Sequence, residues 1–176
     1  MNVLIPAEQI ARRVRELAHD ISEDYRGKTL YAVCVLENGF MFMADLVRAL
    51  EVPVVCQFVK PESRVLDRDG GQTTEIRYSP EVKVQGQHVL LVEGVVKSGV
   101  TQEFLMRNLT ARGALSVKLA TLLDKQAGRR IGLRSDYFGY AIEEQYVIGY
   151  GLGSPLLGRN LPYIATAGKI PASAAG

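Results

Sequence analysis

The chain has 176 residues, of which 47% are hydrophobic and 23% are charged, and its formal net charge is +2. This length suits one domain with a full hydrophobic core. So small a net charge, without a strongly basic stripe, gives no support for nucleic-acid binding. No apolar stretch has the length of a membrane span, and residues 1–10 do not resemble a signal peptide. We therefore expect a cytoplasmic protein with a single domain over 1–170 and a disordered tail at 171–176.

The two cysteines, Cys34 and Cys56, both lie in apolar segments. We interpret them as buried free thiols, because apolar surroundings are typical of free cysteine in a reducing compartment. A disulfide is the alternative. No group of four cysteine and histidine residues is spaced for zinc.

A helix and then a buried strand are predicted at the start of the chain. Pro6 opens a helical pattern, in which apolar residues recur at positions 10, 14, 17 and 21, and Gly27 ends it. Residues 29–36 are nearly all apolar or β-branched, which is typical of a buried strand.

The next segments predict a helix, a strand and a loop. A tight connection at 37–39 leads into a mostly buried helix at 40–50, and a second strand follows at 52–59. Residues 60–72 are polar and contain a Gly-Gly pair, which predicts a mobile loop. Residues 73–78 are short and β-prone.

The strongest local pattern is HVLLVEGVVKSGVTQEFLMRNL at 88–109, which predicts an apolar strand, a Ser-Gly turn and an amphipathic helix. Further strands are predicted at 117–123 and 146–152. Strands that alternate with helices pair in parallel, and ligands of such sheets bind at the carboxyl ends of the strands. We therefore expect the turns at 37–39, 94–101 and 125 to lie on one side of the sheet.

The turn at 97–101 has the composition of an anion cradle. Backbone amides at a helix start, together with the hydroxyls of Ser98 and Thr101, would bind a phosphate, and Gly99 would let the backbone approach it closely. Taken alone, this stretch fits an ordinary strand-to-helix turn equally well.

The wider sequence resembles the hypoxanthine-guanine phosphoribosyltransferases, a branch of the type I phosphoribosyltransferases. The family motif is an apolar strand, two acids, two aliphatic residues, an acid, Thr/Ser-Gly, any residue and Thr, and VLLVEGVVKSGVT is similar to it. The segments VCVLENGFMFMADLVRALEVPV, LLDKQAGRR and EEQYVIGYGL also resemble this branch. The resemblance implies an α/β fold with a central, mainly parallel sheet flanked by helices and a small hood region.

The same resemblance assigns roles to individual residues. It gives the 5′-phosphate to Ser98, Gly99, Val100 and Thr101, the ribose hydroxyls to Glu93, the purine 6-oxygen to Lys125, base stacking to Tyr146, the purine edge to the backbone of Val147, and pyrophosphate to Glu37, Asn38, Gly39 and Arg159. Residues 60–76 would close over the site. Without the resemblance, Tyr146 would be interpreted as a core side chain, and Lys125 and Arg159 as solvated surface charges.

The implied partners are a purine base or nucleotide and phosphoribosyl pyrophosphate or pyrophosphate. The implied assembly is a homodimer or homotetramer, with the helix at 40–50 as a candidate interface.

Several positions depart from the family pattern. Gly94 replaces the second acid of the pair, Lys97 replaces the acid that assists at the purine nitrogen, and Gly153 replaces an acid that helps to hold magnesium. Glu37-Asn38 stands where the family has a basic residue and glycine, and Ser63-Arg64 where it has Ser-Tyr. Mg²⁺ is implied by the family, but Gly94 and Gly153 provide no ligand for it, and no metal ligand is assigned.

Two hypotheses follow for the reversed charges. Glu37 and Lys97 could form an ion pair across the site. Alternatively, Lys97 could supply the positive charge that a metal would have supplied. Lys97 and Glu93 remain the candidates for the catalytic positions.

Two functions remain open. One is a hypoxanthine or guanine phosphoribosyltransferase of purine salvage, a pentosyl-transferring glycosyltransferase, with weak or altered catalysis. The other is a catalytically inactive nucleotide-binding or regulatory homologue, which the lost acids favour. A third possibility, an RNA-binding regulator, is disfavoured by the net charge of +2.

Overall fold

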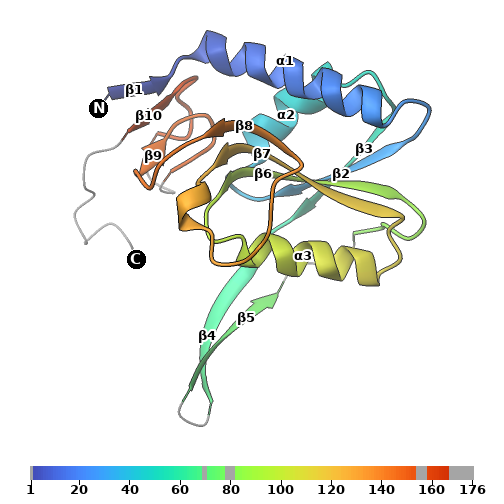
Figure 1. Cartoon of the computed structure of the whole chain (residues 1–176), viewed down its shortest axis with the longest axis vertical. Coiled ribbons are helices and arrows are strands. Elements are labelled where there is room, and N and C mark those ends of the chain that lie inside the picture. Colours follow the sequence, from blue (N-terminus) through green and yellow to red (C-terminus); the bar gives the residue numbers. More distant parts are fainter. Residues whose placement is uncertain (1, 69–70, 78–81, 154–157, 167–176) are drawn as a thin grey trace.

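The computed structural model describes residues 2–68, 71–77, 82–153 and 158–166 (Figure 1). Helices cover both faces of a central five-stranded sheet. Helices α1 (Ala7–Asp24) and α2 (Phe40–Ala49) pack on one face, and α3 (Val100–Ala111) packs on the other. The predicted α/β class is therefore confirmed, and the predicted disordered tail at 171–176 lies outside the described residues.

The three helices agree with the helical patterns in the sequence. Pro6 precedes α1 with a φ of −65°, so it starts the helix without removing a hydrogen bond that the helix needs. Ile10, Val14 and Leu17 recur on one face of α1 and are buried against the sheet.

The central sheet is entirely parallel, in the order β3-β2-β6-β7-β8. Its strands are β3 (Val54–Val59), β2 (Leu30–Val35), β6 (His88–Val96), β7 (Ser116–Asp124) and β8 (Tyr137–Ala141). Side chains alternate between the two faces, so Cys34 joins the core under α1 and α2, while Val33 joins the core under α3. Four of these strands were predicted, and β8 was not.

A small antiparallel sheet forms the hood beside the carboxyl ends of the central strands. It contains β1 (Asn2–Ile5), β10 (Ile164–Thr166) and β9 (Val147–Ile148), in the order β1-β10-β9. The strand predicted at 146–152 is therefore shorter than expected, because the backbone turns at 149–152, where Gly149 and Gly151 have positive φ values.

A mobile loop was predicted at 60–72, but most of the described residues in this range lie in strands, so the prediction of a loop is wrong. Strands β4 (Glu62–Arg68) and β5 (Gly71–Arg77) form an antiparallel hairpin that extends away from the body of the molecule (Figure 1). Polar residues can form such a ribbon because cross-strand backbone hydrogen bonds require no apolar face. A short 3₁₀ turn, Gln126–Gly128, follows β7.

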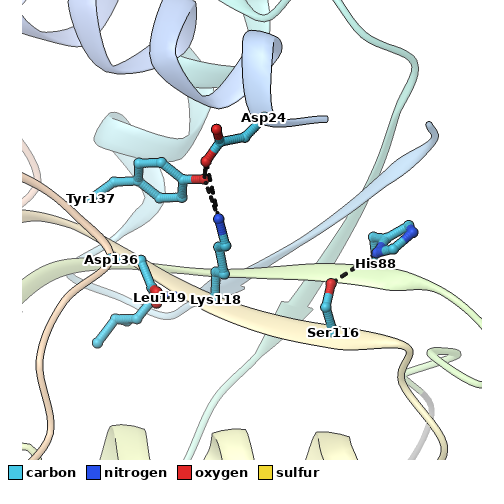
Figure 2. Close-up of polar contacts among 7 residues, drawn as sticks. All are labelled: Asp24, His88, Ser116, Lys118, Leu119, Asp136 and Tyr137. Carbon is cyan, nitrogen blue, oxygen red and sulfur yellow. Dashed lines mark hydrogen bonds and ion pairs between the residues drawn. The ribbon is translucent and has the colours of Figure 1, made fainter. Parts of the chain in front are cut away.

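A polar cluster joins the end of α1 to the amino ends of strands β7 and β8 (Figure 2). Tyr137 donates a hydrogen bond to Asp24, and the Lys118 ammonium lies 3.0 Å from both the Asp24 carboxylate and the Tyr137 hydroxyl. Nearby, His88 Nδ1 lies 2.8 Å from Ser116 Oγ. This cluster lies at the edge of the sheet opposite the carboxyl ends.

Both cysteines are free thiols, as expected. Cys34 is buried, and burial raises the pKa of its thiol to about 12. Cys56 is exposed, so its predicted burial is wrong, because β3 is an edge strand of the sheet. None of the described helices is both long and apolar enough to cross a membrane.

Candidate functional site

The turns that follow β2, β6 and β7 converge at the carboxyl edge of the sheet, as predicted. The turns after β2 and β7, together with Val95 of β6, meet the segment around β9 at a cavity of 130 Å³. The residues that line this cavity are Asn38, Val95, Lys125, Tyr146, Val147, Leu152 and Gly153. The cavity therefore brings together predicted residues that lie more than 100 positions apart in the chain.

Lys125 and Tyr146 have the exposure of site residues. Lys125 is only 9% exposed, and its ammonium donates a hydrogen bond of 2.6 Å to the carbonyl of Gln145. Burial lowers the pKa of Lys125. Tyr146 is 41% exposed at the cavity. The alternatives of a solvated surface lysine and a core tyrosine are therefore both wrong.

The predicted phosphate turn connects β6 to α3. Gly99 has a φ of +80°, a left-handed conformation that glycine adopts without strain. Gly99, which precedes α3, has no side chain to cap the helix, so first-turn amides beyond that of Val100 can meet an anion. The Ser98 hydroxyl lies 3.4 Å from the backbone nitrogen of Val100.

The segment LLDKQAGRR, at 122–130, packs against this turn. Arg129 donates a hydrogen bond of 3.1 Å to the carbonyl of Lys97 and forms a partly buried ion pair with Asp124. The backbone nitrogen of Arg130 donates to the carbonyl of Ser98 at 3.0 Å. Arg129 therefore supports the 97–101 turn, and only its place in the LLDKQAGRR segment could have indicated this.

Glu93 points into the protein rather than toward the cavity. Its carboxylate is 4% exposed and accepts hydrogen bonds from Gly94 N at 3.1 Å and Gln102 Nε2 at 2.9 Å. Burial raises the pKa of Glu93 to about 7, and the two hydrogen bonds oppose this shift. The carboxylate oxygens are therefore already occupied by protein donors. Gln102 is a partner that the sequence analysis missed.

Position 94, where the family pattern has an acid, is packed so closely that only glycine fits. A Cβ atom at this position would lie 2.1 Å from the carbonyl oxygen of Asn38 and 2.8 Å from Leu152 Cδ2. No side chain fits at this distance unless the 37–39 turn moves. The absence of a side chain at Gly94 therefore sets how closely the backbone of the 37–39 turn approaches β6.

The predicted ion pair between Glu37 and Lys97 does not form. The Lys97 ammonium lies 2.6 Å from the Glu144 carboxylate. Glu37 instead lies 3.1 Å from Lys60 and 3.5 Å from Arg159, and these cations lower its pKa. The reversed charges at 37 and 97 are thus each balanced by a nearer partner.

Arg159 lies at the predicted pyrophosphate turn. Its guanidinium donates to Asn38 Oδ1 at 3.1 Å and to the carbonyl of Gly151 at 2.8 Å. The structure therefore brings Arg159, Glu37 and Asn38 together, and it does so through direct contacts within the protein.

The described residues do not form a metal site of the usual kind. None of those that line the cavity is acidic, and no group of three or more His, Cys, Asp or Glu in the described part of the chain is placed to hold an ion. Magnesium prefers carboxylate oxygens and water, together with substrate phosphates. The side chains present do not fit a protein-held magnesium ion.

Comparison with known proteins identifies the family. The model of the phosphoribosyl transferase domain matches residues 4–154. A hypoxanthine-guanine phosphoribosyltransferase of Bacillus subtilis is 32% identical over 162 residues, which cover 92% of this chain and 90% of that protein. The chain belongs to the hypoxanthine-guanine phosphoribosyltransferase family.

Solved structures agree with this membership. The phosphoribosyltransferase fold of this chain superposes on the hypoxanthine phosphoribosyltransferase of Trypanosoma cruzi in complex with the product IMP, with a TM-score of 0.85 and 34% identity, covering 94% and 93% of the two chains. A bifunctional TilS/HprT protein of Listeria innocua is 34% identical over 92% of this chain, which spans 25% of that relative's length. Family membership therefore covers nearly the whole chain.

Proposed function

We propose that this phosphoribosyltransferase-family protein binds a 6-oxopurine nucleotide, and phosphoribosyl pyrophosphate with the base, and transfers the phosphoribosyl group slowly. The main support is the cavity that a buried lysine, Lys125, and an exposed aromatic ring, Tyr146, line together at the carboxyl edge of the sheet, where β6 also leads into the 98–101 turn. A lysine donor selects the 6-oxygen, a ring stacks on the base, and helix-start amides hold the phosphate. Val147 at the cavity wall would read the purine edge through its backbone.

Slow transfer is supported by the lack of a carboxylate that is free to accept a proton at the positions where the family has acids. Transfer breaks the bond from the ribose carbon to pyrophosphate and forms a bond to the purine nitrogen, which loses a proton. A carboxylate that accepts this proton typically contributes about 10²–10⁴-fold. Lys97 occupies that position as a charged ammonium paired with Glu144, so it cannot accept a proton. Glu93 is buried and hydrogen-bonded to Gln102.

Pyrophosphate binding should also be weak, because a carboxylate lies beside the arginine that would hold it. Arg159 would meet pyrophosphate, but Glu37 already lies beside it. A carboxylate at this position repels an anionic leaving group and competes for the guanidinium. We propose that magnesium, if required, is held by the phosphates of the substrate.

A second candidate is a nucleotide-binding homologue without catalysis. It is favoured by the absence of any acidic side chain among the described residues that line the cavity. Both candidates bind a purine nucleotide, and they differ only in turnover.

The test is one binding experiment and one assay. IMP or GMP binding is measured by calorimetry, with and without a chelator, and nucleotide formation is followed with phosphoribosyl pyrophosphate, magnesium, and hypoxanthine or guanine. We expect nucleotide binding with turnover at least 100-fold below ordinary members of the family. Absence of IMP and GMP binding overturns the proposed function, and turnover at the ordinary rate refutes the impaired site.

A restored variant tests the cause. Lys97→Asp is combined with Glu144→Gln, because an aspartate at 97 would otherwise face the Glu144 carboxylate. We expect kcat to rise at least ten-fold. Gly94→Asp is omitted because its side chain would collide with the 37–39 turn. No gain in kcat would show that position 97 is not the limiting defect.

A further inference from the structure

Three charged side chains lie together at the edge of the cavity. The Glu144 carboxylate is 2.6 Å from the Lys97 ammonium, and it also interacts electrostatically with Lys125, so both cations lower the pKa of Glu144. Lys125 lines the cavity and Lys97 does not. One carboxylate therefore interacts with a lysine that lines the cavity and pairs with a lysine that does not.

The backbone around Glu144 is tied to both lysines. Glu144 pairs with Lys97 from the end of β6, and the carbonyl of the next residue, Gln145, accepts the hydrogen bond of 2.6 Å from Lys125 at the end of β7. Tyr146 follows directly and faces the cavity. Two successive residues thus connect the segment that carries the aromatic ring to the ends of two central strands.

Gly128 makes room for this pair. A Cβ atom at Gly128 would lie 2.0 Å from Glu144 Oε1 and 3.0 Å from Lys97 Cγ. The Lys97 side chain therefore runs along Gly128 toward Glu144. With Lys97 paired in this direction, Lys125 is the cation among the described residues that line the cavity.

The charges of Lys97 and Glu144 act in opposite directions on the pKa of Lys125. Burial is the largest influence that lowers the pKa of Lys125, Lys97 lowers it further, and Glu144 raises it. These are the charged groups that act on Lys125 in the described part of the chain, from the end of β6 and from the segment before β9. Without Glu144, the unpaired ammonium of Lys97 would favour the neutral form of Lys125.

We infer that Glu144 is a positioning residue of the purine subsite: by pairing with Lys97 it holds and balances that ammonium outside the cavity lining, and so leaves Lys125 as the cation that meets the base. This inference rests on the proposed function, in which Lys125 donates to the purine 6-oxygen. Glu144 itself does not touch the base.

The experiment measures IMP affinity by calorimetry against pH for the wild type, Glu144→Gln, Lys97→Met and the double variant. Glu144→Gln should weaken IMP binding about three- to ten-fold at neutral pH, because Lys97 is released and Lys125 loses its proton more easily. Since binding needs the Lys125 ammonium, affinity falls as pH rises through the pKa of Lys125, and this fall should move to lower pH in Glu144→Gln. Adding Lys97→Met should restore both affinity and pH profile.

Glu23→Gln is the matched control. Glu23 is a carboxylate of similar exposure that pairs with Arg26 at the end of α1, far from the cavity. The inference is overturned if Glu144→Gln binds IMP like the wild type. It is also overturned if the double variant stays as weak as Glu144→Gln, because Glu144 would then act only through backbone structure. If the wild type binds no IMP or GMP, the proposed function itself fails, and this inference fails with it.

Discussion

Gly94 shows how one residue decides both packing and chemistry. Because a Cβ atom would lie 2.1 Å from the Asn38 carbonyl oxygen, Gly94→Ala must push the 37–39 turn away. We expect it to lower the free energy of unfolding by about 1–3 kcal/mol, measured by urea denaturation. Gly132→Ala is the control, because a Cβ atom there meets nothing within 4 Å. Equal stability of the two variants would contradict this packing argument.

Glu93 predicts a pH dependence of stability. Its pKa is about 7 in the folded protein, above its ordinary value of 4.5. The stabilisation from the buried neutral carboxyl is therefore fully present below the ordinary value and is lost as pH rises through about 7. We expect Glu93→Gln to gain stability relative to the wild type at about pH 8 and to differ little at about pH 4. A constant difference between the two proteins in urea denaturation across this range would contradict burial as the cause.

At the scale of elements, the Asp24–Tyr137–Lys118 cluster joins α1 to the sheet (Figure 2). Tyr137→Phe removes a hydrogen bond to a charged acceptor, so we expect a loss of about 1.5–3 kcal/mol in the free energy of unfolding at neutral pH. The Tyr137 hydrogen bond, followed by that of Lys118, lowers the pKa of Asp24, so the loss should shrink as pH falls through the Asp24 pKa.

Tyr140→Phe provides the comparison for this cluster. Its hydroxyl donates to the carbonyl of Gln9 in α1 at 2.8 Å, which joins the same helix and strand through a neutral and exposed bond. We expect a smaller loss, about 0.5–1 kcal/mol, without the acid dependence. Equal losses with the same pH profile would show that the charged cluster has no special role.

At the scale of the whole molecule, the β4–β5 hairpin is separate from the packed layers (Figure 1). We expect replacement of residues 62–77 by a short Gly-Ser linker to change Tm by no more than a few degrees, because the two strands pair with each other and extend away from the packed layers. If the hairpin closes over the ligand, as the family resemblance implies, phosphoribosyl pyrophosphate affinity should fall while the fold persists. A large loss of Tm would show that the hairpin contributes to the stability of the fold. Unchanged affinity for phosphoribosyl pyrophosphate in calorimetry would show that the hairpin does not close over the ligand.

Much of the fold could be predicted because its signals are local. The period of apolar residues in α1, the continuous apolar runs of β2 and β6, and the Ser-Gly turn before α3 each depend on neighbours in the chain. Parallel pairing follows from the alternation of strands and helices. Strand β8 was missed because its sequence, YFGYA, has no clear alternation, and β1 was missed because its partner β10 lies at the other end of the chain.

The sequence by itself determined the family, the parallel sheet and the set of residues near the carboxyl edge, because chain order and residue type carry that information. Only the tertiary structure decided the partner of each charge. Lys97 pairs with Glu144 rather than Glu37, and Glu93 faces Gln102. Such contacts depend on distances of a few ångström between segments far apart in the chain, and sequence spacing does not encode those distances.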